Sequence, residues 1–442
     1  MFKWLSKPGS KTQIIHQQPQ YRSDEFQELF IFMVKCFRQF GLCPVRIEQV
    51  RGKPRFEMSR FLVVAVVFIL LSTWVALVAS FFLKFKTPMI TGIANHIQFI
   101  TNAMALTATL AVPIFKYNDL NGIFEDFNVI DDELNYFNVK LYQSQLKCSF
   151  LKCYIVHVLF LIMSTIYDAH VMLILGRGTQ LWLWFFHLLP FILYSLAFMQ
   201  AFTMIKWVKI RIQHLNSLIE QYYRYPPLDR IGNNKFKVSS LVTLTLDVEK
   251  SETTETCEEL AVNNRILTIV SKTIDLASRL ESYNGLIFLF GYLALFSVTT
   301  IQVYFCYLFM LINKPEQGFS INTFGLSLTI IIGNLVAILA LPYICEQVGN
   351  ESKTLMSYLS KLSMKYGQNV QSSIWFPNLI SSIKFSALGF FNINYNMLSG
   401  FFAALITYLI IFIQFNSIVP AKENEVHLVR KGGEKLGTSG DD

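Results

Sequence analysis

The chain has 442 residues, of which 53% are hydrophobic and 15% are charged. Soluble domains carry roughly 25% charged residues, so this composition indicates a membrane protein and excludes an ordinary soluble domain. In such a chain the net charge of +8 indicates basic cytosolic loops, and we expect no nucleic-acid partner.

The sequence lacks the motifs of enzymatic chemistry. It has no glycine-rich phosphate loop, no nucleophile motif and no group of residues at metal-ligand spacing. Its cysteines form no metal-like pattern, and most lie at or inside the expected cytosolic boundary. We therefore expect no enzymatic activity, no cofactor, no metal site and no disulfide framework.

The first 60 residues are expected to form a cytosolic segment. Residues 1–22 are polar and basic without an apolar core, which predicts a disordered stretch and no cleavable signal peptide. The first spanning helix would then also act as the insertion signal. Residues 24–40 predict an amphipathic helix that lies on the membrane surface. Its apolar residues are Phe26, Leu29, Phe30, Met33 and Phe37.

Seven later stretches are long and apolar enough to cross a bilayer, which takes about 20 residues. They are residues 61–83, 88–114, 154–175, 181–205, 285–312, 323–346 and 394–415. The sequence therefore predicts an all-α, seven-transmembrane protein of the plasma membrane, in contact with membrane lipid.

The lysines and arginines predict the orientation of these spans. Thirty of the 38 lie before the first span or in every second loop after it. Because positive loops stay in the cytosol, the N-terminus should be cytosolic and the C-terminus extracellular. The glycosylation sequon at Asn350 falls on the cytosolic side, which agrees with this. Residues 416–442 would be an extracellular tail, whose last part, 432–442, resembles in part a cloning remnant.

The cytosolic segments carry apolar residues at helical spacing. Within the unit 61–205 we expect a cytosolic helix over 118–147. The segment 206–284 should hold cytosolic helices around a disordered loop at 226–256, and 347–393, after the spans of 285–346, should hold cytosolic anchor helices. The helices could be solvated separately or form one bundle. We favour a bundle, because their apolar faces need a partner.

The outward halves of spans two to six carry more polar and aromatic residues than lipid contact favours. The candidate ligand-binding residues are Asn95, Gln98, Asp168, Trp182, Trp184, His187, Thr300, Gln302, Tyr304 and Asn334. Singly, the tryptophans and tyrosines are also typical of interfacial belts, and Asp168 could pair with Arg177 or His187. Convergence from five helices favours a pocket. Polar groups amid aromatic rings suit a sugar, and a more apolar arrangement would suit bitter compounds.

The last span, 394–415, carries a polar or small stripe at helical spacing. Its members, beginning just before the span, are Asn392, Asn396, Ser399, Ala403, Thr407, Ile410 and Gln414. Such a stripe either packs against neighbouring helices or lines a water-filled path. The spacing alone leaves both possibilities open.

The end of this span carries a short motif. Thr407 and Tyr408, five apolar residues, then Gln414 and Phe415 spell TYLIIFIQF. The motif resembles the signature that closes the seventh helix of insect gustatory receptors. Within that family, the sequence as a whole resembles the fructose-sensing branch. That resemblance implies a tastant-gated channel for permeant cations, a homotetramer whose pore is lined by four copies of this helix. It places Gln414 and Phe415 at the gate, with Thr407, Ile410 and Ser399 along the pore.

Two other classes of protein have seven or more spans. A receptor that signals through cytosolic partners is disfavoured, because the third span lacks an Asp-Arg-Tyr-like triplet and the orientation is inverted. A secondary transporter is disfavoured, because the sequence shows no internal repeat and no matching pair of broken helices.

Overall fold

The computed structural model describes residues 24–50, 53–82, 89–137, 139, 143–174, 181–224, 251–311, 321–366 and 383–436. Of residues 181–187, 251–263 and 416–436, and of some residues near helix ends, it describes the backbone alone. The elements are α1 (Asp24–Arg38), β1 (Val45–Val50), β2 (Lys53–Met58), α2 (Arg60–Phe82), α3 (Met89–Phe115), α4 (Tyr117–Tyr136), α5 (Gln143–Ile174), α6 (Leu181–Arg224), α7 (Ser251–Leu311), α8 (Ile321–Tyr366) and α10 (Tyr395–Leu436).

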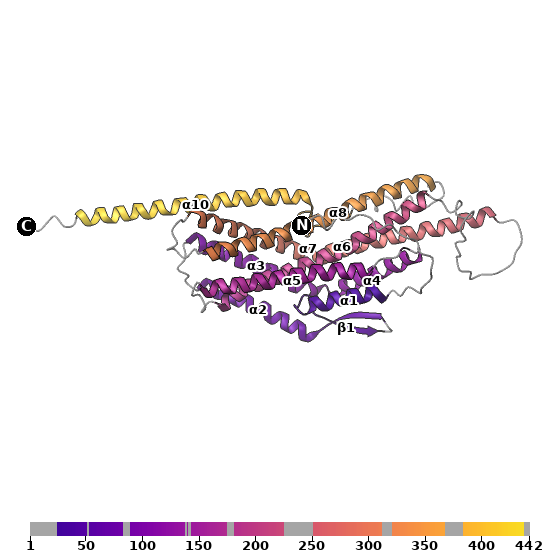
Figure 1. Cartoon of the computed structure of the whole chain (residues 1–442), viewed down its shortest axis with the longest axis horizontal. Coiled ribbons are helices and arrows are strands. Elements are labelled where there is room, and N and C mark those ends of the chain that lie inside the picture. Colours follow the sequence, from indigo (N-terminus) through magenta and orange to yellow (C-terminus); the bar gives the residue numbers. More distant parts are fainter. Residues whose placement is uncertain are drawn as a thin grey trace, which may run out of the picture.

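Long helices run side by side along the longest axis of the molecule (Figure 1). Within the described residues, seven helices are long and apolar enough to cross a membrane. This confirms the predicted all-α class with seven spans. The last helix, α10, runs past the others toward the C-terminus and is helical well beyond residue 415, where we placed the start of a tail.

Three helices are much longer than a membrane crossing. With 44, 61 and 46 residues, α6, α7 and α8 measure about 66, 92 and 69 Å, against about 30 Å of bilayer hydrocarbon. Their extensions pack on one another and on α4 at one end of the molecule. The helix α7 begins at Ser251, inside the segment where we expected a disordered loop, and residues 225–250 lie outside the described residues.

The single helix expected over 118–147 is wrong, because the chain forms two helices there. The helix α4 ends at Tyr136, where the amide of Phe137 donates to the carbonyl of Leu134 at 3.1 Å, and α5 begins at Gln143. The tighter bond to the third preceding residue ends the α-helical ladder. The apolar face of α4 is buried, including Phe127 and Ile130.

The helix α1 exists as predicted, but its apolar face does not turn toward lipid as we expected. Its apolar face is buried within the protein. The ring of Phe26 lies 5.3 Å from that of Phe127 on α4 and 5.5 Å from that of Trp207 on α6. The ring centre of Phe37 lies 5.9 Å from that of Tyr154 on α5. A protein surface formed by α4, α5 and α6 therefore takes the place that we had assigned to lipid.

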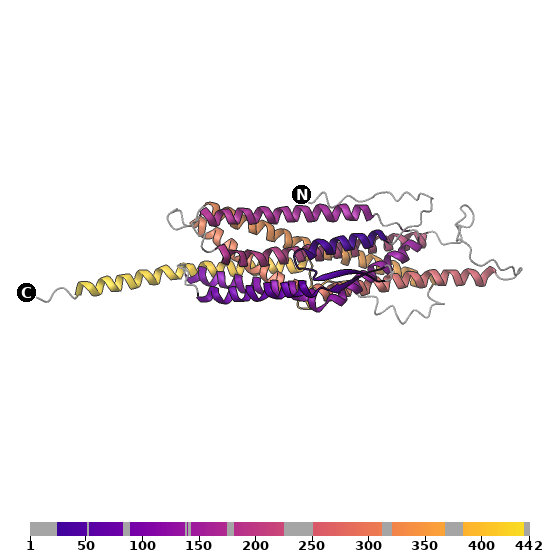
Figure 2. The same cartoon turned by 90° about the horizontal axis from the view of Figure 1, so that it is seen from below.

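A two-stranded antiparallel hairpin follows α1, and we did not predict it. In β1 and β2, Val45 pairs with Met58 and Ile47 with Phe56. The side chain of Asn121 on α4 accepts from the amide of Phe56 at 2.9 Å and donates to its carbonyl at 2.7 Å. These two bonds hold the hairpin against α4, and Figure 2 shows the strands beside the helical bundle.

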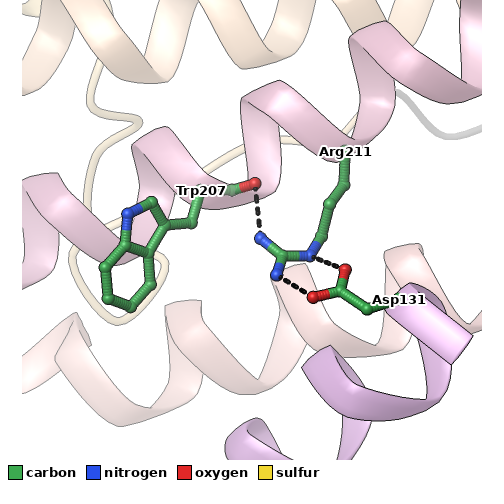
Figure 3. A network of polar contacts seen from close by, with 3 residues as sticks. All are labelled: Asp131, Trp207 and Arg211. Atoms are coloured by element: carbon green, nitrogen blue, oxygen red, sulfur yellow. Dashed lines mark hydrogen bonds and ion pairs between the residues drawn. The ribbon is translucent and has the colours of Figure 1, made fainter. Parts of the chain in front are cut away.

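One buried ion pair joins α4 to α6 inside this end of the molecule. The guanidinium of Arg211 donates to both carboxylate oxygens of Asp131, at 2.7 and 2.6 Å (Figure 3). It also donates to the carbonyl of Trp207 at 3.1 Å. Such a two-pronged pair fixes both the distance and the rotation of one helix relative to the other.

Candidate ligand site and pore helix

Buried polar side chains form a group along α7, on its sides toward α3 and toward α8, about half-way along the apolar stretches of these helices. The hydroxyls of Thr101 on α3 and Ser297 on α7 are 2.6 Å apart and share a hydrogen bond. The amide nitrogen of Asn334 on α8 donates to the hydroxyl of Thr299 on α7 at 3.1 Å. Polar groups at this depth are costly in lipid, so their burial between helices is expected.

Two amide oxygens of this group have no hydrogen-bond donor among the described residues. They are Oδ1 of Asn102 on α3 and Oδ1 of Asn334, and both side chains are buried. A buried acceptor without a donor costs about 1–3 kcal/mol. Each oxygen can therefore accept a hydrogen bond from a hydroxyl or amine of a bound molecule, and such a bond would relieve that cost.

The structure places the sequence-predicted ligand residues unevenly. Gln98, Asp168, Thr300, Gln302, Tyr304 and Asn334 are buried. Asn95 is exposed, so it does not point into the interior of this chain. The side chains of Trp182, Trp184 and His187, together with Arg177, lie outside the described residues.

Close packing holds the end of α5 that carries Asp168 against α8. A Cβ atom on Gly325 would lie 2.5 Å from the hydroxyl of Tyr167, and one on Gly333 would lie 2.9 Å from the ring of Phe160. At both distances a Cβ atom would displace the aromatic side chain of α5. The two glycines therefore allow α5 to approach α8 closely.

The sequence analysis did not identify two polar pairs inside the spans, His157 with Ser195 and Thr101 with Ser297. Nε2 of His157 on α5 lies 3.0 Å from the hydroxyl of Ser195 on α6, and Ser297 pairs with Thr101 as described above. A histidine inside an apolar span is itself a signal that a partner exists, because an unpaired imidazole is costly there. Single serines carry no such signal, because their hydroxyls can bond to their own helix.

The start of α10 is fixed to α7 by a short turn. The carboxylate of Glu281 accepts from the amide of Ser386 at 3.1 Å and also from its hydroxyl. That hydroxyl accepts in turn from the amide of Gly389 at 3.0 Å, in a turn where Gly389 has a φ of 79°. The side chain of Asn394 then caps α10 by accepting from the amide of Met397 at 3.0 Å.

The two faces of α10 differ in what they contact. One face packs on α7, where Phe296 lies 5.4 Å from Phe401 and Tyr304 lies 5.4 Å from Phe412, ring centre to ring centre. The opposite face is the predicted stripe, and it is exposed along its whole length. Its exposed members are Asn392, Asn396, Ser399, Ala403, Thr407, Ile410 and Gln414. Phe415, which follows the stripe, is 58% exposed.

The hydroxyl groups on this stripe are oriented by their own helix. Ser399 donates to the carbonyl of Asn396 at 2.8 Å, and Thr407 donates to the carbonyl of Ala403 at 2.9 Å. With the protons used in this way, the free lone pairs of both oxygens remain on the exposed side. The stripe therefore presents acceptors, which suit water and cations.

Comparison with known proteins places this arrangement in a family. A family model described as a 7tm chemosensory receptor matches residues 31–418, which is most of the chain. The chain belongs to the 7tm chemosensory receptor family. The resemblance drawn from the TYLIIFIQF motif is thereby confirmed at the level of chemosensory receptors.

The receptor also resembles individual members. It is 26% identical over 148 residues to Gustatory receptor 68a of Drosophila melanogaster, an alignment that spans 32% of this chain and 37% of that protein. Its structure resembles the insect olfactory receptor OR5 from Machilis hrabei, with a TM-score of 0.58 and 12% identity, over 89% of this chain and 99% of that one. The complex of that receptor with eugenol gives a TM-score of 0.53 at the same identity and coverage. At this identity the likeness shows the shared fold.

Proposed function

We propose that this receptor is a ligand-gated, non-selective cation channel that opens when it binds a small tastant. The observation that carries the proposal is the exposed polar face of α10. A helix in lipid should be apolar on its exposed side, because polar groups in hydrocarbon are costly. The centre of the exposed side of α10 holds Asn396, Ser399, Thr407 and Gln414, with Ile406, Ile410 and Ile411 beside them, so this polar line suits water or another copy of the chain better than lipid.

In a homotetramer, the exposed polar face of α10 would meet both water and other copies of the chain. Four copies of α10 around one axis would place the stripe on a central aqueous path and leave the apolar faces packed on α7. Membership of the chemosensory receptor family and the fold shared with the insect olfactory receptor OR5 support this arrangement. The N-terminus would lie in the cytosol and the C-terminus outside, as the distribution of lysine and arginine indicates.

The chemistry of the stripe favours cations without selecting among them. Ser399 and Thr407 present oxygen lone pairs on the exposed face. Residues 392–415 contain no Asp or Glu, so no ring of fixed negative charge would line the path. Selective cation pores use such rings or rings of carbonyl oxygens. Sodium, potassium and calcium should therefore all permeate.

The gate would be formed by the last residues of the motif. Four Phe415 rings converging on the axis would make an apolar constriction, which blocks ions by excluding water. Gln414 points about 100° away around the helix, so a modest rotation or outward tilt of α10 would exchange a phenyl ring for an amide at the narrowest point.

The ligand would bind beside α7, within the polar group that lies toward α3 and α8. The free acceptor oxygen of Asn334 favours a molecule that carries hydroxyl groups, such as fructose, and that of Asn102 offers a second acceptor on the α3 side of α7. Asp168, with Trp182, Trp184 and His187 on α6, would add further contacts. A bitter or aromatic compound is the alternative ligand class, and the eugenol complex of OR5 shows that a receptor of this fold takes an aromatic molecule.

Whole-cell recording tests this proposal. Cells that express the receptor are exposed to fructose, other sugars and a panel of bitter compounds, with G-protein signalling blocked inside the pipette. The proposal predicts an inward current that reverses near 0 mV and survives the block. A response that disappears under the block would instead indicate a receptor that signals through cytosolic partners.

A further inference from the structure

A shallow hollow opens between α5 and α6, away from the polar group and from α10. Its floor is formed by buried side chains that include Phe150 and Trp207. Its lining also includes the polar side chains of Ser149, Cys153, Thr203 and Lys206. The hollow therefore combines an apolar floor with one ammonium group at its edge.

The ammonium of Lys206 is held over this hollow by a neutral partner. Its Nζ donates to the hydroxyl of Ser149 at 2.7 Å. Among the described residues, no carboxylate lies within ion-pair distance of Lys206. A half-buried positive charge that has only a neutral hydroxyl as partner is incompletely compensated, and an anion in the hollow would complete it.

The two helices that line the hollow carry only basic charges beside it. Residues 143–153 of α5 and 202–212 of α6 contain no acidic side chain. The one arginine there, Arg211, is turned inward to Asp131. The remaining charges on these stretches are Lys147, Lys152, Lys206 and Lys209. The last turn of α1, which packs on α5, adds Lys35 and Arg38, while the acidic first turn of α1 lies at the other end of that helix, where Phe26 packs on Trp207. Clustered lysines of this kind attract anionic headgroups at a membrane surface.

The hollow also lies at the right depth for a lipid headgroup. Both helices change from apolar to basic at this level. The basic part of α5 lies before Tyr154 in the sequence, and that of α6 lies after Ile205. On the apolar side, α5 exposes Ile155, Val156 and Leu159, at 46%, 63% and 55% of their surface. An acyl chain can lie along these side chains while its headgroup reaches Lys206. By the positive-inside rule this end of the helices belongs to the inner leaflet.

We propose that this hollow binds the phosphate headgroup of an anionic phospholipid of the inner leaflet, of the phosphoinositide class. The phosphate would accept from Lys206 and Ser149, and the flanking lysines would favour a headgroup with more than one phosphate. The exposed apolar strip on α5 distinguishes a lipid from a soluble phosphate, which would have no use for it.

Binding to the purified full-length receptor tests the proposal and does not require a working channel. The probe is a fluorescent short-chain phosphatidylinositol bisphosphate. Four competitors are added in turn: the unlabelled lipid, phosphatidylcholine, soluble inositol trisphosphate and inorganic phosphate. Lys206→Gln should weaken binding about fivefold, because one lysine near the surface is worth that much. Lys206→Arg should bind as the wild type does.

Two further variants complete the experiment. Lys353→Gln, on the exposed surface of the α8 extension, removes one lysine elsewhere and should leave binding unchanged. Cys153→Trp fills the hollow without changing charge, so it should also weaken binding and replaces Lys206→Gln if that variant elutes as aggregate.

Equal binding by wild type and Lys206→Gln, or by wild type and a folded Cys153→Trp, would overturn the site. Equal loss in Lys353→Gln would show a response to net charge alone, and would overturn it too. Displacement by soluble inositol trisphosphate or inorganic phosphate as effective as by the lipid would overturn the assignment to a membrane lipid.

Discussion

Arg211 and Asp131 form a salt bridge that is almost completely shielded from solvent. Their side chains are 0% and 6% exposed, and the guanidinium carbon lies 4.4 Å from the ring centres of both Phe26 and Phe127. Burial raises the pKa of the Asp131 carboxyl, and the guanidinium opposes that shift. The pair therefore joins α1, α4 and α6 through charge and aromatic contact together.

Replacing Arg211 by methionine should destabilise the receptor by about 3–5 kcal/mol, because it leaves a carboxylate buried without a partner. Without the guanidinium the pKa of Asp131 rises further, so the folded state holds a proton that the unfolded state has lost. Stability of the variant should therefore fall as pH rises above about 4, the ordinary value for a free carboxyl. Thermal unfolding of the solubilised receptor at several pH values measures both effects.

The matched control is Arg265→Met, which breaks the half-exposed pair with Glu133, 3.3 Å apart. Exposed pairs contribute up to about 1 kcal/mol, so this change should be small. Equal melting temperatures for the two variants would show that the Arg211 pair does not stabilise the fold as described.

Asn334 carries the prediction for the ligand site. Asn334→Leu keeps the size of the side chain but removes the amide that bonds Thr299 and the free oxygen beside it. Loss of one or two hydrogen bonds to the tastant should raise its half-maximal concentration about tenfold. Asn95→Ala, at an exposed position, should leave the dose–response curve unchanged. Calcium influx measures both, and a curve for Asn334→Leu that overlies the wild type would move the site elsewhere.

At the scale of elements, the sequence predicts where helices form better than it predicts what they pack against. Runs of apolar residues are local, so all seven spans could be read directly. The place of α1 could not, because an apolar face such as that of Phe26, Phe30 and Phe37 suits either lipid or protein. The hairpin was missed because its strands have six residues each, and Asn121, which holds it, is far away in sequence.

The candidate site shows the same division. The polar character of Asn334 and Thr300 within apolar helices was visible in the sequence. Which of them meet was not visible, because the pairing of Thr101 with Ser297 depends on how α3 packs on α7. The stripe on α10 was predictable in full, since helical spacing alone fixes which residues share a face. Its exposure depends on which face packs on α7.

The helix α10 carries the prediction for the gate. Phe415→Ala should raise the current without tastant, because a methyl group cannot exclude water from the constriction. A leakier gate should also lower the tastant concentration needed, because less binding energy is required to reach the open state. Phe415→Trp keeps an apolar ring and should stay silent at rest. A silent Phe415→Ala channel with normal surface expression and unchanged sensitivity would remove Phe415 from the gate.

At the scale of the whole molecule, α7 connects the two sites. Ser297 and Thr299 face the polar group on α3 and α8, while Phe296 lies against Phe401 and Tyr408 of α10 at 5.4 and 5.6 Å. The turn after Ser386 ties the start of α10 to Glu281 of the same helix. A shift of α7 when a tastant binds would therefore be transmitted to α10 through these contacts.

The orientation of the whole chain is a separate prediction. An epitope inserted before Asp24 should be reached by antibody only after the cells are permeabilised. One inserted after Val419 should be reached in intact cells. An epitope in the cytosolic extension of an unrelated membrane protein serves as the control for cell integrity. The reverse pattern would contradict the inverted arrangement and would place the basic hollow at Lys206 in the outer leaflet.

Accessibility of α10 to a charged thiol reagent tests the central claim most directly. Two variants are compared, Thr407→Cys and Leu405→Cys. Thr407 lies on the exposed stripe, and Leu405 is buried on the same helix. A positively charged methanethiosulfonate is applied outside while a tastant holds the channel open, with the wild type as background for the native cysteines. We predict that the reagent reduces the current through Thr407→Cys and leaves Leu405→Cys and wild type unchanged. An unchanged current through Thr407→Cys, with labelling of that cysteine shown by mass spectrometry, would contradict a pore lined by α10.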